Sequence, residues 1–138
     1  MDRQRMFAEG APWHVPCMRQ VAQEVDGVAT RRSARTIFTC FVPPARAQQM
    51  PGMWWNRYEK WPMMTADGLH RPRAVTGGLA SPARVFGKMI YSPPASGELH
   101  RTLLADEVRT LVLTGGETEA CVLAASLDII DLGCKVMG

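Results

Sequence analysis

The feature that most constrains this 138-residue chain is a short apolar run that ends in two glycines and leads into a helical pattern. Thr110–Thr114 reads TLVLT, which predicts a buried β-strand, and Gly115-Gly116 follows directly. Glycine permits the sharp bend that a strand-to-helix turn needs. Thr118 is a suitable N-cap residue, and Cys121 would then lie three residues inside the helix. The pattern predicts a strand–turn–helix unit with a thiol in its first helical turn.

A cysteine in that position has a possible chemical role. The unpaired N–H groups and the positive end of a helix dipole favour a thiolate, which is a nucleophile, and the same groups can bind an oxyanion. The alternative interpretation is structural. Cys121 would then be a small apolar residue packed at the start of a helix, as free cysteines often are. On spacing alone, the structural interpretation is favoured.

The composition narrows the class of protein. Hydrophobic residues make up 46% of the chain and charged residues 21%, which is typical of a globular protein, and the length predicts one domain over residues 1–138. The net charge of +3 is scattered, so no nucleic-acid partner is expected. No apolar run reaches membrane-spanning length and no secretory signal is recognisable, so we expect a cytoplasmic protein without a membrane partner.

Helical and strand patterns alternate along the rest of the chain. Helices are expected over Val15–Ala29 and Ser96–Asp106, and strands over Thr36–Val42, Arg84–Phe86 and Lys135–Met137. Strands that alternate with helices predict an α/β protein with a parallel sheet. A binding site in such a fold lies at the carboxyl ends of the strands, which is where the predicted cysteine turn also lies.

Two further expectations concern packing. In the last predicted helix, Leu123, Leu127 and Ile130 are expected to form the buried stripe, with Gly133 at the C-terminal cap. The region Pro43–Pro82 is rich in Pro, Met and Trp and is expected to be irregular. It is too aromatic for a disordered linker, so it either forms part of a site or is an ordered surface loop.

Three segments together resemble the isochorismatase-like cysteine hydrolase superfamily. Residues 114–122, TGGETEACV, are similar to the family's T-G-x-x-T-x-x-C-V, residues 85–92, VFGKMIYS, contain its K-x-x-Y-S, and residues 2–7, DRQRMF, resemble its D-x-Q-x-x-F. The resemblance implies a three-layer α/β/α, Rossmann-like fold with a mostly parallel central sheet. The family's first strand and its C-terminal strand and helix have no counterpart here, so we expect a sheet that lacks them.

The resemblance also implies roles for individual residues. The family's catalytic triad carries over to Asp2 as general base, Lys88 as the cation that favours a thiolate, and Cys121 as nucleophile. A cis peptide maps to Gly116–Glu117, and the backbone N–H groups of Glu117 and Cys121 would form the oxyanion hole. The substrate site would be lined by Phe7, Trp54, Tyr91 and Thr118.

The implied activity is that of a metal-free cysteine hydrolase, which cleaves a C–N bond of a small amide or ureido substrate through a thioester. Family members that bind a metal use a D-x-H…H cluster, and His70 is the only histidine between Arg46 and Arg73. We therefore expect no cofactor. We expect the protein to form a homo-oligomer. Two alternatives stay open: a catalytically impaired fragment or pseudoenzyme that serves as an oligomerisation or interaction module, and a thiol-based redox protein. The second lacks a resolving cysteine close to Cys121 in sequence.

Overall fold

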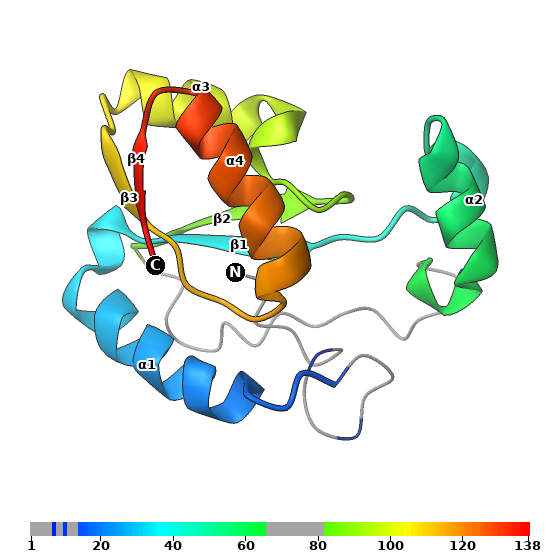
Figure 1. Cartoon of the computed structure of the whole chain (residues 1–138), viewed down its shortest axis with the longest axis horizontal. Coiled ribbons are helices and arrows are strands. Elements are labelled where there is room, and N and C mark those ends of the chain that lie inside the picture. The colour runs from blue at the N-terminus through cyan, green and yellow to red at the C-terminus, as the bar shows by residue number, and fades with distance from the viewer. Residues whose placement is uncertain (1–6, 8–9, 11–13, 66–81) are drawn as a thin grey trace.

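The computed structural model describes residues 7, 10, 14–65 and 82–138, which form a mixed α/β structure (Figure 1). The helices and strands, in chain order, are α1 (Met18–Arg31), β1 (Ile37–Phe41), α2 (Met53–Lys60), β2 (Arg84–Lys88), α3 (Glu98–Ala105), β3 (Thr110–Val112), α4 (Leu123–Asp131) and β4 (Lys135–Met137). Six of the predicted elements are present with shifted ends, and the strand at residues 135–137 is confirmed without change. The alternation of helices and strands is therefore confirmed.

All strand pairs among the described residues are parallel. β1 pairs with β2, from Ile37 opposite Arg84 to Phe41 opposite Lys88, and β3 pairs with β4 over three residues each. Within the described part of the chain, these pairs form two separate two-stranded sheets. Parallel neighbours need a crossover connection, and the chain supplies one in each case with helical segments between the paired strands. The predicted parallel α/β arrangement is confirmed.

Helices lie on opposite sides of β1 and β2, with α1 on one side and α3 on the other (Figure 1). The contact between α1 and β1 is a buried cluster formed by Val25, Ala29 and Phe38. Val25 and Ala29 are one turn apart, so they share the face of α1 that meets the strand. A second buried cluster joins α2, through Tyr58, to Phe7 and other residues that precede it in the chain. These layers place the carboxyl ends of β1 and β2 beside α2.

The region expected to be irregular contains α2, and that prediction is wrong for Met53–Lys60. The helix starts after Pro51-Gly52, where Gly52 has a φ of 56° that favours glycine over other residues. Tyr58 is only 3% exposed, so tertiary packing of its aromatic ring helps to hold a helix that is only eight residues long. Residues 66–81 of the predicted irregular region lie outside the described residues.

Helix α4 buries a different face from the one predicted. The three residues expected to be buried are about half exposed: Leu123 at 50%, Leu127 at 54% and Ile130 at 53%. The buried residues are Ala125 and Ile129, at 1% and 2% exposure, and Cys121 lies one further turn toward the N-terminus at 7%. Because positions 121, 125 and 129 are spaced by four, they lie on one helical face. The packing of that face turns the thiol toward the interior. Gly133 follows the helix with a φ of 84°, as expected of a C-terminal glycine.

Candidate active site

The turn between β3 and α4 carries the cysteine, and its helical part begins differently from the prediction. After Gly116 the chain enters a π-helical turn, Thr118–Val122, that continues directly into α4. The N-cap residue is Glu117, with φ 55° and ψ 57°, so the prediction that Thr118 caps the helix is wrong. A left-handed conformation costs a residue other than glycine about 1–2 kcal/mol. Such strain and single π-helical turns are both associated with functional sites.

Gly116 allows this turn to approach the start of the chain closely. A Cβ atom built at Gly116 would lie 3.2 Å from Cγ1 of Val15, which is closer than most Cβ contacts. Val15 is itself 9% exposed, and its backbone N–H donates a hydrogen bond to the carbonyl of Phe7. The absence of a side chain at Gly116 therefore lets the cysteine turn pack against the segment before α1.

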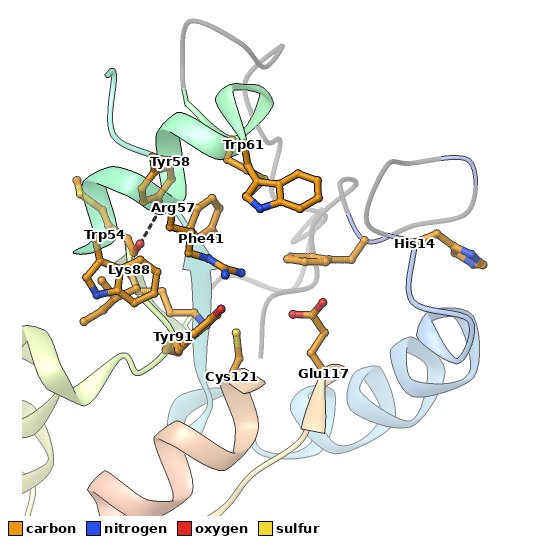
Figure 2. A pocket seen from close by; sticks show the side chains of 14 residues that line it. His14, Phe41, Trp54, Arg57, Tyr58, Trp61, Lys88, Tyr91, Glu117 and Cys121 are labelled. Carbon is orange, nitrogen blue, oxygen red and sulfur yellow. Dashed lines mark hydrogen bonds between the residues drawn. The ribbon is translucent and has the colours of Figure 1, made fainter. Parts of the chain in front are cut away.

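A cavity of about 300 Å³ opens above this turn (Figure 2). Its walls come from the end of β1, from α2, from the segment that follows β2, and from the turn before α4. Figure 2 shows the Cys121 thiol and the Glu117 carboxylate pointing into the cavity from the turn, opposite the side chains of α2. The position at the carboxyl ends of β1 and β2 agrees with the prediction for a parallel sheet.

Lys88 is the last residue of β2 and is only 4% exposed. Its Nζ atom donates a hydrogen bond of 2.8 Å to the backbone carbonyl of Tyr91. A buried ammonium group is costly unless it is hydrogen-bonded or paired, and this bond meets part of that need. The hydrogen bond closes a turn in the segment that follows β2. Lys88 and Tyr91 line the same cavity as Cys121.

The structure brings most of the predicted site residues together. Those that line the cavity are Phe7, Trp54, Lys88, Tyr91, Glu117 and Cys121. Gly116 adjoins Glu117 without lining the cavity. Thr118 is exposed and lies outside the lining, so the structure does not group it with the other residues predicted to contact the substrate. Asp2 lies outside the described residues.

Helix α2 and its C-cap residue supply three cavity residues that were not predicted from the sequence: Arg57, Tyr58 and Trp61. Together with Trp54, which was predicted, they follow one another at i, i+3, i+4 and i+7. This spacing is that of one helical face, so the signal was present in the sequence. It was overlooked because the flanking prolines and glycine suggested an irregular loop. Phe41, at the end of β1, and His14 were also missed, since neither belongs to a recognisable pattern.

The aromatic side chains are fixed against one another. The Tyr58 hydroxyl donates a hydrogen bond of 2.7 Å to the carbonyl of Met89, and its ring stacks on Phe41 with centroids 6.4 Å apart. The ring of Trp54 meets that of Tyr91 edge-on, with centroids 5.1 Å apart. Burial raises the pKa of the Tyr58 hydroxyl above its ordinary value, against a smaller lowering by Arg57, so the group is a neutral donor at physiological pH. The result is a rigid aromatic wall.

A buried hydrogen bond connects the Lys88 segment to the cysteine helix. The Ser92 hydroxyl donates to Oδ2 of Asp128 on α4, and Ser92 is 7% exposed. Ser92→Ala is expected to lower the free energy of unfolding by about 1.5–3 kcal/mol, because it leaves a carboxylate with one partner fewer. Urea denaturation measures this effect. Ser96→Ala is the control, since Ser96 is exposed and bonds only a nearby carbonyl. Equal losses for the two variants would contradict the prediction.

The described residues include neither a membrane-spanning helix nor a cluster of metal ligands. None of the helices in residues 14–65 and 82–138 is long and apolar enough to cross a membrane. In the same part of the chain, no three side chains of His, Cys, Asp or Glu are arranged to hold a metal ion.

Comparisons with known proteins agree with this architecture. The model of the isochorismatase domain matches residues 1–137. A solved structure of a cysteine hydrolase from Pseudomonas syringae pv. phaseolicola superposes with a TM-score of 0.73 at 19% identity, over 98% of this chain and 65% of that one. An isochorismatase family protein from Desulfovibrio vulgaris gives a TM-score of 0.70 at 22% identity, over 98% of this chain and 74% of that one.

A search of curated protein sequences found no match. This chain is shorter than the proteins in both solved structures, spanning 65% of the first and 74% of the second. At these identities the structural likeness supports the fold, whereas the family assignment comes from the domain match over residues 1–137. The fold, the cysteine turn and the domain match together show that the chain belongs to the isochorismatase family.

Proposed function

We propose that this protein is a cysteine hydrolase that cleaves the C–N bond of a small amide or ureido compound through a thioester on Cys121. The observation that supports this most directly is that Cys121 and Lys88 line one aromatic cavity at the carboxyl ends of the strands. A cationic side chain near a thiol favours the thiolate, which is the nucleophilic form. The cavity volume of about 300 Å³ suits a small molecule.

The first half of the reaction forms the thioester. Asp2 takes the thiol proton, and the Cys121 sulfur adds to the substrate carbonyl carbon. The resulting oxyanion is held by the backbone N–H groups of Glu117 and Cys121. When the tetrahedral intermediate collapses, the C–N bond breaks and the nitrogen leaves as an amine or ammonia, with the proton that Asp2 returns. The acyl or carbamoyl group remains on the sulfur.

The second half of the reaction releases the product. Asp2 takes a proton from water, and the oxygen adds to the thioester carbonyl carbon. The C–S bond then breaks, Asp2 returns the proton to the sulfur, and the Cys121 thiol is restored. The products are an acid, or a carbamate from a ureide, together with the amine or ammonia from the first half. Lys88 keeps its charge throughout and stabilises the thiolate, and the carboxylate of the base, by electrostatic attraction.

The test is hydrolysis of a panel of primary amides and ureides, measured as ammonia release after dialysis of the protein against a strong chelator. We expect turnover of some members of the panel, undiminished by the chelator. Intact-mass spectrometry of the quenched reaction should detect an acyl adduct on Cys121. A protein that releases no ammonia from any member would refute the proposal, and activity lost on dialysis and restored by zinc or manganese would refute its metal-free form.

A further inference from the structure

Arg57 is directed into the cavity in a way that the hydrolysis itself does not require. It lies on α2, and Figure 2 shows its guanidinium group in the middle of the cavity, on the side facing Cys121 and Glu117. Its Cζ atom lies 5.1 Å from the centroid of the Tyr91 ring. Within the part of the chain that the structure describes, the Arg57 side chain contacts this ring and is not paired with a carboxylate.

The position of Arg57 is fixed by its neighbours. Tyr91 lies between Arg57 and Trp54, which meets the ring edge-on at 5.1 Å between centroids. Tyr58, the residue after Arg57, bonds the carbonyl of Met89, so α2 is tied to the segment that follows β2. That segment is tied in turn to Lys88 through the carbonyl of Tyr91. These contacts connect the Arg57 guanidinium to Lys88 through Tyr91.

The charged side chains lie on opposite walls of the cavity, with the cation Arg57 on one and the anion Glu117 on the other. The Lys88 ammonium is buried and hydrogen-bonded, whereas the donors of Arg57 face the cavity from the α2 wall. The Glu117 carboxylate points inward from the opposite wall, on the turn that carries the thiol. A guanidinium group offers a planar pair of N–H donors that matches a carboxylate, and a ring stacked on its face leaves those donors free to bind. Glu117 repels an anion and accepts hydrogen bonds from N–H groups.

We propose that Arg57 determines specificity for an anionic substrate: the cavity binds a small amide or ureido compound that carries a carboxylate. Arg57 binds the carboxylate, and the amide or ureido end lies on the Glu117 side, within reach of Cys121. This inference rests on the proposed function, since it concerns the substrate of the same site. It goes beyond that function by assigning the charge of the substrate and its orientation, with the anionic end toward α2.

The test compares matched acids and esters. Ureidoacetate, 3-ureidopropanoate and succinamate are each assayed beside their methyl esters, which are similar in size and neutral. At least one acid should be hydrolysed with a higher kcat/KM than its ester. Arg57→Gln should lower kcat/KM for that acid by about 10-fold to 100-fold, mainly through KM, and should lower kcat/KM for the ester much less. Arg57→Lys should recover only part of the loss, because an ammonium lacks the paired donors. Arg19→Gln, an exposed change on α1 away from the cavity, is the control.

A binding measurement separates this inference from the hydrolysis. Trp54 and Trp61 line the cavity, so a bound carboxylate should change the tryptophan fluorescence. Succinate is titrated into the wild type and into Arg57→Gln, and we expect saturable binding that the variant weakens at least 10-fold. If acids are hydrolysed no better than esters, and succinate binds the two proteins equally, the assignment of Arg57 is overturned while the hydrolase function stands. If nothing is hydrolysed but succinate binding depends on Arg57, the anion site stands and the proposed reaction fails.

Discussion

Replacement of Cys121 with alanine is expected to abolish hydrolysis of every amide and ureide that the wild type turns over. The loss should be on the order of 10⁴-fold to 10⁶-fold in kcat, because Cys121 is the one thiol among the described residues that line the cavity. Lys88→Met, which keeps the length of a buried side chain without its charge, should remove most of the activity. At neutral pH an unassisted thiol, with a pKa near 8.5, is mostly protonated. Single-turnover assays with quenched-flow mass spectrometry should show no adduct on the alanine variant.

The control for both changes is Cys134→Ala. Cys134 is partly buried and its Sγ donates to the carbonyl of Val108, but it does not line the cavity. The Cys134→Ala variant should therefore keep wild-type turnover even if it loses some stability. Activity that survives in Cys121→Ala, in a sample free of wild-type protein, would show that the nucleophile has been misassigned. A Lys88→Met variant with full activity and a wild-type pH profile would remove the electrostatic role assigned to that lysine.

The second large effect is expected at Asp2. Asp2→Asn keeps the size of the side chain and removes the base, so kcat should fall by about 100-fold to 10,000-fold. Asp2 lies outside the described residues, so this prediction depends on the resemblance of residues 2–7 to the family's D-x-Q-x-x-F. The assay is ammonia release at saturating substrate. Asp131→Asn, an exposed change at the end of α4, is the matched control.

The double variant Asp2→Asn, Cys121→Ala tests whether the two residues act in the same step. If the two residues act in one step, the double variant should be no slower than Cys121→Ala alone. Independent, multiplying losses would instead indicate that Asp2 acts elsewhere, for example in folding. An unchanged rate in Asp2→Asn would mean that the match at the N-terminus is accidental, and that another group is the base.

Part of the site could be predicted because it depends on short, local signals. The apolar run before Gly115-Gly116 was expected to be a buried strand. That burial was predicted wrongly, since Thr110 and Val112 of β3 are exposed. The turn itself could be predicted, because the glycines permit a bend and the helical pattern that follows places Cys121 near the start of a helix. A strand was predicted over Arg84–Phe86, two residues before Lys88, and in the structure β2 extends to Lys88. Parallel strands bring their carboxyl ends to one edge, and the structure finds Lys88 and Cys121 on one cavity.

Other parts of the site depend on residues far apart in the chain. Helix α2 was missed because Pro and Gly around it are ordinary signs of a loop, and eight residues have little helical stability in isolation. The helix is stabilised by burial of Tyr58 and by its hydrogen bond to Met89, 31 residues further along the chain. No local pattern contains that contact. The spacing of residues 54–61 is enough to place Arg57 on one helical face, but not to place it beside Tyr91.

The sequence by itself determined the order of the strands and of the helices other than α2, because these follow from local periods and turns. The strand–helix alternation predicted the parallel sheet. The roles expected of Lys88 and Cys121 came from the resemblance of their segments to the family. Only the tertiary structure decided which faces are buried. Helix α4 carries two apolar stripes. Its packing buried Ala125 and Ile129 and left Leu123, Leu127 and Ile130 exposed. A period identifies the faces of a helix, but the choice between them belongs to the surface it packs against. In this protein the packing of α4 turned Cys121 inward, and the packing of α2 placed Arg57 on the opposite wall of the cavity.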